Sequence, residues 1–180
     1  METIRQVNGQ HPQDVSGIAR VHVDSWRSTY RGIVPDHYLD TLSYDKRIQS
    51  WNTIFNNPES RETVLVALNE DEQIVGFVSG GPARDALLDY PGELYAIYLL
   101  ESAQGHGLGR RLIQALSETL LQSDLTSMYL WALTENPACR FYERLGGQYL
   151  RTQSFEIEGV QIEERAYGWP DIRTLLPARQ

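Results

Sequence analysis

The feature that most constrains this fold is a glycine-rich segment between an apolar stretch and an amphipathic one. The apolar stretch is Glu93–Leu100 (ELYAIYLL), and the following Glu101–Leu112 (ESAQGHGLGRRL) places three glycines within five positions. From Leu108 to Leu120 a leucine recurs every fourth residue, which is the spacing of one helical face. The chain is therefore predicted to pass from a buried strand through a bare loop into a helix.

A loop of this kind is suited to binding an anion. The first N–H groups of a helix lack internal partners, and glycine lets them approach a phosphate without a Cβ in the way. Two phosphate loops do not fit. The dinucleotide fingerprint needs a sixth-position glycine, where Gly105 leads to Arg110 and Gly107 leads to Leu112. The nucleotide P-loop needs a lysine, which this segment lacks.

The pattern that remains, Gln104-x-x-Gly107-x-Gly109, resembles the acyl-coenzyme A loop of the GNAT acetyltransferase superfamily, written Arg/Gln-x-x-Gly-x-Gly/Ala. Asn136–Gly147 (NPACRFYERLGG) likewise resembles the Asn/Tyr helix of that family, although Gly147 stands where a Phe is frequent. The order strand, glycine loop, helix, strand and Asn/Tyr helix matches the family's sequence of parts.

The remaining periodicities predict helices first and then strands. Helices are expected over Val15–Tyr30, from Pro35 through Leu42, and from Ser43 to Phe55. Strands are expected over Thr3–Val7, Glu62–Leu68, Gln73–Ser79, Glu93–Leu100, Met128–Leu133, Tyr149–Ile157 and Gln161–Tyr167, with Gly80-Gly81-Pro82 breaking one of them. This is an α+β pattern. The resemblance implies a mixed, mainly antiparallel central sheet flanked by helices, in which a splayed pair of strands forms the cofactor cleft, and residues 1–180 read as one domain.

Composition excludes several classes of protein. The net charge of −8 and the lack of a Lys/Arg cluster argue against nucleic acid as a partner. No apolar run is long enough to cross a bilayer and no leader segment is visible, so a cytoplasmic protein without a membrane partner is expected. The lone Cys139 and the lack of a Cys/His cluster predict no metal site and a buried, inert thiol.

The resemblance implies acetyl-coenzyme A as a co-substrate, bound where the Ile97 strand diverges from Met128–Leu133. Backbone groups of Ile97 and Leu99 would pair with the pantetheine arm, and the glycine loop would hold the pyrophosphate. His106 and either Arg110 or Arg111 would reach the other phosphate. Asn136 would bond the pantetheine arm and also cap its helix. The cofactor residues implied are Ile97, Tyr98, Leu99, Gln104, Gly105, His106, Gly107, Leu108, Gly109, Arg110 and Asn136.

Acetyl transfer to an amine sets two further requirements. An alkyl amine with a pKa of about 10.4 must lose a proton before it attacks, and the leaving thiolate benefits from a proton donor. Tyr142 occupies the family's donor position, although an aromatic on this face also suits the core. Glu93 is the leading base because burial in an apolar strand disfavours a charged carboxylate. One alternative is that Glu93 is a solvated residue just after the Pro91-Gly92 turn. Another is that a water chain, and not Glu93 itself, takes the proton.

The first helices, Val15–Phe55, are expected to form the acceptor wall, with Trp26, Tyr30 and Tyr95 as substrate-binding residues. Most of the other aromatic residues there suit core packing. We therefore expect an N-acetyltransferase that moves acetyl to a primary amine by direct attack in a ternary complex, with a small amine favoured over a protein and a homodimer possible. A non-catalytic acyl-coenzyme A sensor and a different nucleotide-binding protein are the alternatives.

Overall fold

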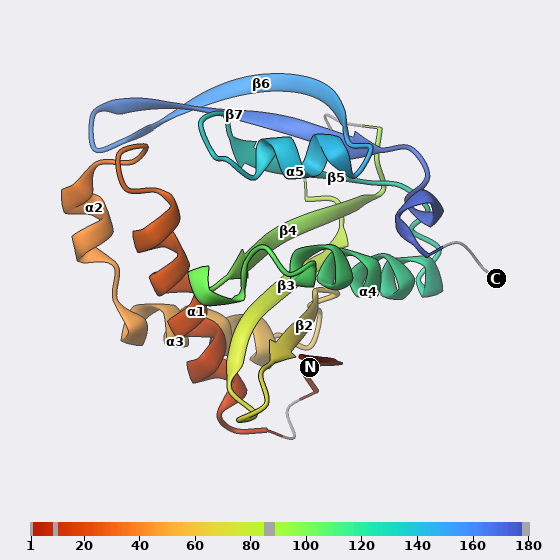
Figure 1. The fold of residues 1–180 in the computed structure, drawn as a ribbon, viewed down its shortest axis with the longest axis horizontal. Coiled ribbons are helices and arrows are strands. Elements are labelled where there is room, and N and C mark those ends of the chain that lie inside the picture. Colours follow the sequence, from red (N-terminus) through yellow and green to blue (C-terminus); the bar gives the residue numbers. More distant parts are fainter. Residues whose placement is uncertain (1, 9–10, 85–88, 178–180) are drawn as a thin grey trace.

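The computed structural model describes residues 2–8, 11–84 and 89–177 and shows a mixed α+β fold built on one seven-stranded sheet (Figure 1). The strand order is β1-β2-β3-β4-β5-β7-β6, and every neighbouring pair is antiparallel except β4 and β5. The strands are β1 (Thr3–Gln6), β2 (Thr63–Leu68), β3 (Ile74–Pro82), β4 (Gly92–Leu99), β5 (Met128–Leu133), β6 (Gln148–Ile157) and β7 (Val160–Trp169). The helices are α1 (Asp14–Thr29), α2 (Asp36–Thr41), α3 (Tyr44–Asn56), α4 (Leu108–Gln122) and α5 (Cys139–Arg144), with 3₁₀ turns at Glu101–Ala103 and Ile172–Leu175.

Helices cover both faces of the sheet. One core joins α1 and α3 to β2 and β3, with Ile18 and Trp51 packed against Val66 and Phe77. The other core joins α4 and α5 to the opposite face, where the α4 leucines are buried. Because both faces are covered, β2 and β3 are buried along nearly their whole length, which explains their continuous apolar sequence.

A third, smaller core closes the molecule near the β6–β7 hairpin. This core contains Tyr30 and Val34, from the segment that follows α1, and Leu39 from α2, packed with Leu133 and Ile162. A contact between His37 Nε2 and the Glu158 carboxylate also joins α2 to the hairpin turn, and Figure 1 shows α2 beside the tip of this hairpin. Among the described residues, no helix combines the length and apolarity that a membrane span requires.

The predicted break after Ser79 is wrong, because β3 continues through Gly80 and Gly81 to Pro82. A β-bulge accommodates these residues: Ser79 lies opposite Ala96 and Gly80 opposite Leu94, so Tyr95 is left between them. A Cβ on Gly81 would lie 2.7 Å from the Arg61 carbonyl oxygen. The glycine therefore permits close approach of backbones inside a strand and does not end it.

The predicted splayed pair of strands is confirmed. The parallel pairing of β4 and β5 is limited to Gly92 with Met128 and Glu93 with Tyr129. Beyond these residues β4 pairs only with β3, and β5 pairs with β7. The two central strands therefore diverge, and this divergence opens the sheet at its centre.

Candidate active site

A cavity of about 710 Å³ lies at the divergence of β4 and β5. Its walls come from α1, β4, the glycine loop, β5 and α5. The lining residues are Ser25, Ser28, Thr29, Tyr30, Leu94, Tyr95, Ala96, Ile97, Tyr98, Leu99, Glu101, Gln104, Gly105, Gly107, Gly109, Arg110, Leu130, Trp131, Ala132, Asn136, Pro137, Ala138, Phe141, Tyr142, Arg144 and Leu145. Segments that are distant in the sequence thus meet around one space.

The glycine loop presents free backbone donors at this cavity. Gly105 and Gly107 both have φ of +81°, a conformation that glycine adopts without steric cost. Within the described part of the chain, no backbone carbonyl accepts a hydrogen bond from the N–H groups of residues 105–110. Gly109 lies close to the Phe141 ring, which a Cβ would approach to 3.4 Å. These donors, at the start of a fifteen-residue helix, are suited to holding a phosphate.

The exposed edge of β4 supplies further backbone groups. The Leu100 N–H donates to the Val75 carbonyl, and hydrogen bonding alternates along an antiparallel pair. The peptide groups of Ile97 and Leu99 therefore face away from β3, on the side where β5 has diverged. The Leu99 carbonyl accepts hydrogen bonds from Ser25 Oγ at 3.0 Å and from Gln104 Nε2 at 3.1 Å. Gln104 thus ties the start of the glycine loop to β4.

The two arginines after the loop have different surroundings. Arg111 donates to a carboxylate oxygen of Glu2 at 3.1 Å and to its backbone carbonyl at 2.5 Å. Arg110 is exposed and lines the cavity. Of the two arginines left open by the sequence, Arg110 is therefore the one at the site. His106 and Leu108 do not line the cavity; His106 is exposed and the Leu108 side chain is in the core.

Asn136 lines the cavity and precedes α5. Its Oδ1 accepts a hydrogen bond from the Ala138 N–H at 2.9 Å, and its Nδ2 donates to the Tyr30 hydroxyl at 3.3 Å. Asn136 was expected to cap the helix, but the helix begins only at Cys139. The Asn136 side chain therefore stabilises the turn that precedes the helix. Asn136 also holds Tyr30 at the cavity wall.

Tyr142 is a buried phenol that lines this cavity. The residue is 6% exposed, and its hydroxyl makes no hydrogen bond to any residue that the structure describes. Burial, and secondarily the neighbouring Tyr98, raises the pKa of Tyr142 above its ordinary value. The side chain is therefore a neutral phenol at physiological pH and can donate a proton.

The aromatic residues expected at the acceptor wall are only partly brought together. Tyr30 and Tyr95 line the cavity, but Trp26 does not. Trp26 packs 4.7 Å from the Tyr30 ring and 6.2 Å from Tyr38, in the small core beside α2. Trp26 lies on the apolar face of α1, and its side chain therefore packs against this core, behind Tyr30.

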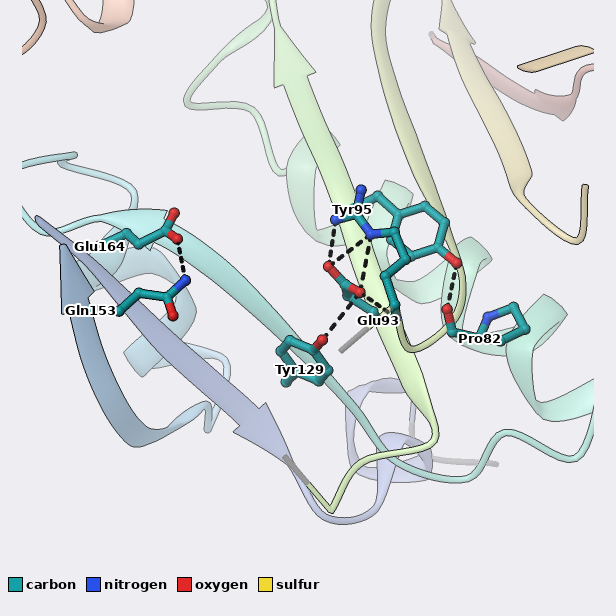
Figure 2. A network of polar contacts seen from close by, with 7 residues as sticks. Pro82, Glu93, Tyr95, Tyr129, Gln153 and Glu164 are labelled. Atoms are coloured by element: carbon teal, nitrogen blue, oxygen red, sulfur yellow. Dashed lines mark hydrogen bonds and ion pairs between the residues drawn. The ribbon is translucent and has the colours of Figure 1, made fainter. Parts of the chain in front are cut away.

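Glu93 lies at the closed end of the β4–β5 divergence and does not line the cavity (Figure 2). It is 3% exposed, so the solvated alternative is wrong. Its Oε2 accepts hydrogen bonds from the Arg84 N–H at 2.9 Å and from the Tyr129 hydroxyl at 3.1 Å, and Arg84 Nη2 lies 2.5 Å from Oε1. The buried carboxylate of the expected base is therefore held in an ion pair with Arg84, whose side chain is mostly exposed.

Several lining residues were missed by the sequence reasoning. Arg144 follows Tyr142 by two positions in the Asn/Tyr motif and lines both this cavity and an adjacent groove that also includes Arg110. Trp131 alternates with the core residues of β5, a pattern that signals a side chain on the opposite face. No local sequence signal marked Ser25, whose role depends on the distant Leu99 carbonyl.

Comparison with known proteins agrees with this geometry. The model of the acetyltransferase (GNAT) family matches residues 20–147. The uncharacterized N-acetyltransferase YuaI of Bacillus subtilis (strain 168) is 41% identical over 175 residues, which are 97% of this chain and 96% of the relative.

A local match extends to the L-2,4-diaminobutyric acid acetyltransferase of Chromohalobacter salexigens, 46% identical over 55 residues, or 31% of this chain and 28% of that enzyme. The fold matches the crystal structure of the PaiA N-acetyltransferase of Thermoplasma acidophilum in complex with coenzyme A, with a TM-score of 0.64, 18% identity and coverage of 92% of this chain and 98% of the other. The chain therefore belongs to the GNAT family of acetyltransferases.

Proposed function

We propose that this acyltransferase moves an acetyl group from acetyl-coenzyme A to the primary amine of a small molecule, by direct attack within a ternary complex. One observation carries the proposal. Among the described residues, the glycine-loop N–H groups and the Tyr142 hydroxyl both lack hydrogen-bond partners, and both border the same cavity. Residues 1–180 would form one acetyltransferase domain.

The residues present fit the cofactor's chemical parts. The N–H groups of residues 105–110 would hold the pyrophosphate. The outward-facing peptide groups of Ile97 and the N–H of Leu99 would accompany the pantetheine arm, since the Leu99 carbonyl already accepts two hydrogen bonds. Asn136 lines the cavity and would bond the same arm. Arg110 and Arg144 make no ion pair with any described carboxylate, and together they would bind the remaining phosphate.

Bound acetyl-coenzyme A would supply an acetyl group activated as a thioester. Tyr142 would then give its phenolic proton to the departing sulfur, which leaves with the electron pair of the broken C–S bond, while the new C–N bond forms. The raised pKa keeps Tyr142 protonated before the reaction but also makes its proton harder to release, so the transfer would accompany the breaking of the C–S bond. The proton lost by the amine would leave through water, because Glu93, the base expected from the sequence, does not line the cavity and its carboxylate is held by Arg84 and Tyr129.

A small acceptor suits the aromatic residues of the cavity wall. Tyr30, Tyr95, Tyr98 and Trp131 line it, and the core between α2 and the β6–β7 hairpin lies behind Tyr30. Such rings contact an alkyl chain and attract an ammonium group. The name of the Chromohalobacter relative specifies a small diamino acid as its acceptor, which supports the same class here.

The experiment that tests the proposal couples calorimetry to a thiol-release assay. Acetyl-coenzyme A should bind with measurable heat, and free thiol should appear only when a suitable member of a panel of small amines and peptides is added. Heat without amine-dependent thiol would identify a non-catalytic acyl-coenzyme A sensor. No heat, or preferential binding of ATP or NAD, would reject the acetyltransferase.

A further inference from the structure

Glu93 needs a physical explanation because burying a carboxylate is costly. Among the described residues, two carboxylates are buried: Asp14 at 1% exposure and Glu93 at 3%. Each is held by one arginine, Arg5 for Asp14 and Arg84 for Glu93. Desolvation of a charge is offset only when a partner and further hydrogen bonds replace the lost water. Both sites meet this condition, but only Glu93 lies next to the cavity.

The Glu93 carboxylate is saturated with donors. Arg84 Nε lies 3.2 Å from each oxygen, in addition to the Nη2, backbone N–H and Tyr129 contacts described above. A carboxylate has about four lone-pair positions, so these contacts use its acceptor capacity. Direct proton abstraction by Glu93 would therefore require breaking the ion pair.

The network continues from Arg84 to the cavity wall. The Arg84 guanidinium carbon lies 4.2 Å from the centre of the Tyr95 ring, which lines the cavity. The Tyr95 hydroxyl donates to the Pro82 carbonyl at 2.5 Å, and Figure 2 shows this bond on the opposite side of the ring from Glu93. The Arg84 side chain is 62% exposed, so Glu93 is what fixes its orientation.

Tyr95 depends on such support because of its backbone position. It is the bulged residue of β4, with no partner on β3, and β4 has no strand on its other side beyond Glu93. A bulge re-aims the side chain that it carries. The ring is therefore placed by its contacts with Arg84 and Pro82.

We infer that Glu93 is a positioning residue that acts through Arg84 to hold the Tyr95 ring as a wall of the acceptor site. This inference rests on the proposed function only for its kinetic consequences. Acceptor binding, and not proton transfer, then depends on Glu93.

The kinetic experiment compares Glu93→Gln and Arg84→Gln with Asp14→Asn. Asp14→Asn disturbs the other buried ion pair, which lies away from the cavity, and serves as the matched control for damage to folding. Glu93→Gln and Arg84→Gln should each raise the acceptor KM about tenfold and lower kcat less than threefold, and their double variant should be no worse than either single variant.

The acidic limb of the kcat profile against pH should persist. A kcat loss of 100-fold or more in Glu93→Gln alone, with loss of that limb, would instead make Glu93 the base and overturn the inference.

A second measurement does not require activity. In protein labelled with fluorotyrosine, the ¹⁹F resonance assigned by its loss in Tyr95→Phe should shift or broaden in Glu93→Gln and Arg84→Gln, but not in Asp14→Asn. An unchanged Tyr95 resonance in Glu93→Gln would overturn the inference even if no amine were acetylated. Conversely, a shifted resonance in a protein that transfers no acetyl group would support the positioning role and reject only the proposed function.

Discussion

At the scale of single residues, Tyr142 and Tyr167 differ in what their hydroxyls contact. Both are buried and lie on the same side of the sheet, with ring centres 6.2 Å apart. The Tyr167 hydroxyl donates to Glu143 Oε1 at 3.0 Å, whereas the Tyr142 hydroxyl has no protein partner among the described residues. Buried hydroxyls are usually hydrogen-bonded, so an unbonded one at a cavity is suited to a bound substrate.

This difference predicts a selective effect of removing one oxygen atom. Tyr142→Phe should lower kcat about 100-fold, because proton donation to the leaving thiolate is lost. Its Kd for coenzyme A should change less than about twofold, because the ring and its packing remain. Thiol-release kinetics measure kcat, and calorimetry measures the Kd for coenzyme A. Tyr167→Phe is the control, and equal losses of kcat in both variants would contradict the proton-donor role.

The residue scale also shows where sequence reasoning ends. Tyr142 and Asn136 were found because they lie in a motif with fixed spacing, and the structure places both at the cavity. The partner of Glu93 was not found, because Arg84 belongs to the loop between β3 and β4 and meets Glu93 only when the hairpin forms. Trp26 was misplaced because helical periodicity identifies an apolar face without showing which part of it borders a cavity.

At the scale of elements, the glycine loop has a conformation that only some residues tolerate. Gly107 has φ of +81° and precedes α4, and a Cβ added there would meet no atom within 4 Å. The cost of a side chain is thus conformational. Gly159, in the β6–β7 turn, has φ of +82° and equally open surroundings, but it lies outside the cavity lining.

Gly107→Ala and Gly159→Ala should therefore separate stability from binding. Each substitution should cost about 1 kcal/mol in the free energy of unfolding, because a Cβ disfavours the left-handed conformation. Only Gly107→Ala should weaken coenzyme A binding, by roughly tenfold, since relief of the strain moves the loop N–H groups. Chemical denaturation and calorimetry test the pair. Equal affinities for coenzyme A would show that the loop does not bind the phosphates.

Elements were largely predictable because their apolar periods are local properties of the chain. The α4 leucines and the short apolar run of β5 identify their elements directly. The path of β3 through Gly80 and Gly81 was not predictable, because glycine is usually read as a break. Its reason is the close approach of neighbouring carbonyls, 2.7 Å from the position of a Cβ at either residue, which exists only in the folded sheet.

At the scale of the whole molecule, His22 lies where α1, α3 and the sheet meet. Its ring centre is 4.8 Å from that of Tyr98, 5.9 Å from Phe77 and 6.3 Å from Trp51. Its Nδ1 is buried and has no hydrogen-bond partner among the residues that the structure describes. Burial, with a smaller contribution from the charge of Arg47, lowers the pKa of His22 to about 3. The folded protein thus keeps this imidazole neutral, whereas the unfolded chain protonates it near its ordinary pKa of about 6.5.

Stability of the whole fold should therefore fall as the medium becomes mildly acidic. Because the unfolded state binds the proton first, the stabilisation by neutral His22 is complete above about pH 6.5 and is lost progressively as the pH falls towards 3. Between pH 7 and pH 5 this linkage amounts to about 2 kcal/mol in the free energy of unfolding, a window in which most carboxylates remain ionised.

Urea unfolding of the parent protein and of His22→Phe at both pH values measures this difference. The variant should lose most of it, and the exposed-site control His106→Gln should keep it. Parallel behaviour of the parent and His22→Phe would show that the pH dependence arises elsewhere, since removing the one buried imidazole among the described residues would then have changed nothing.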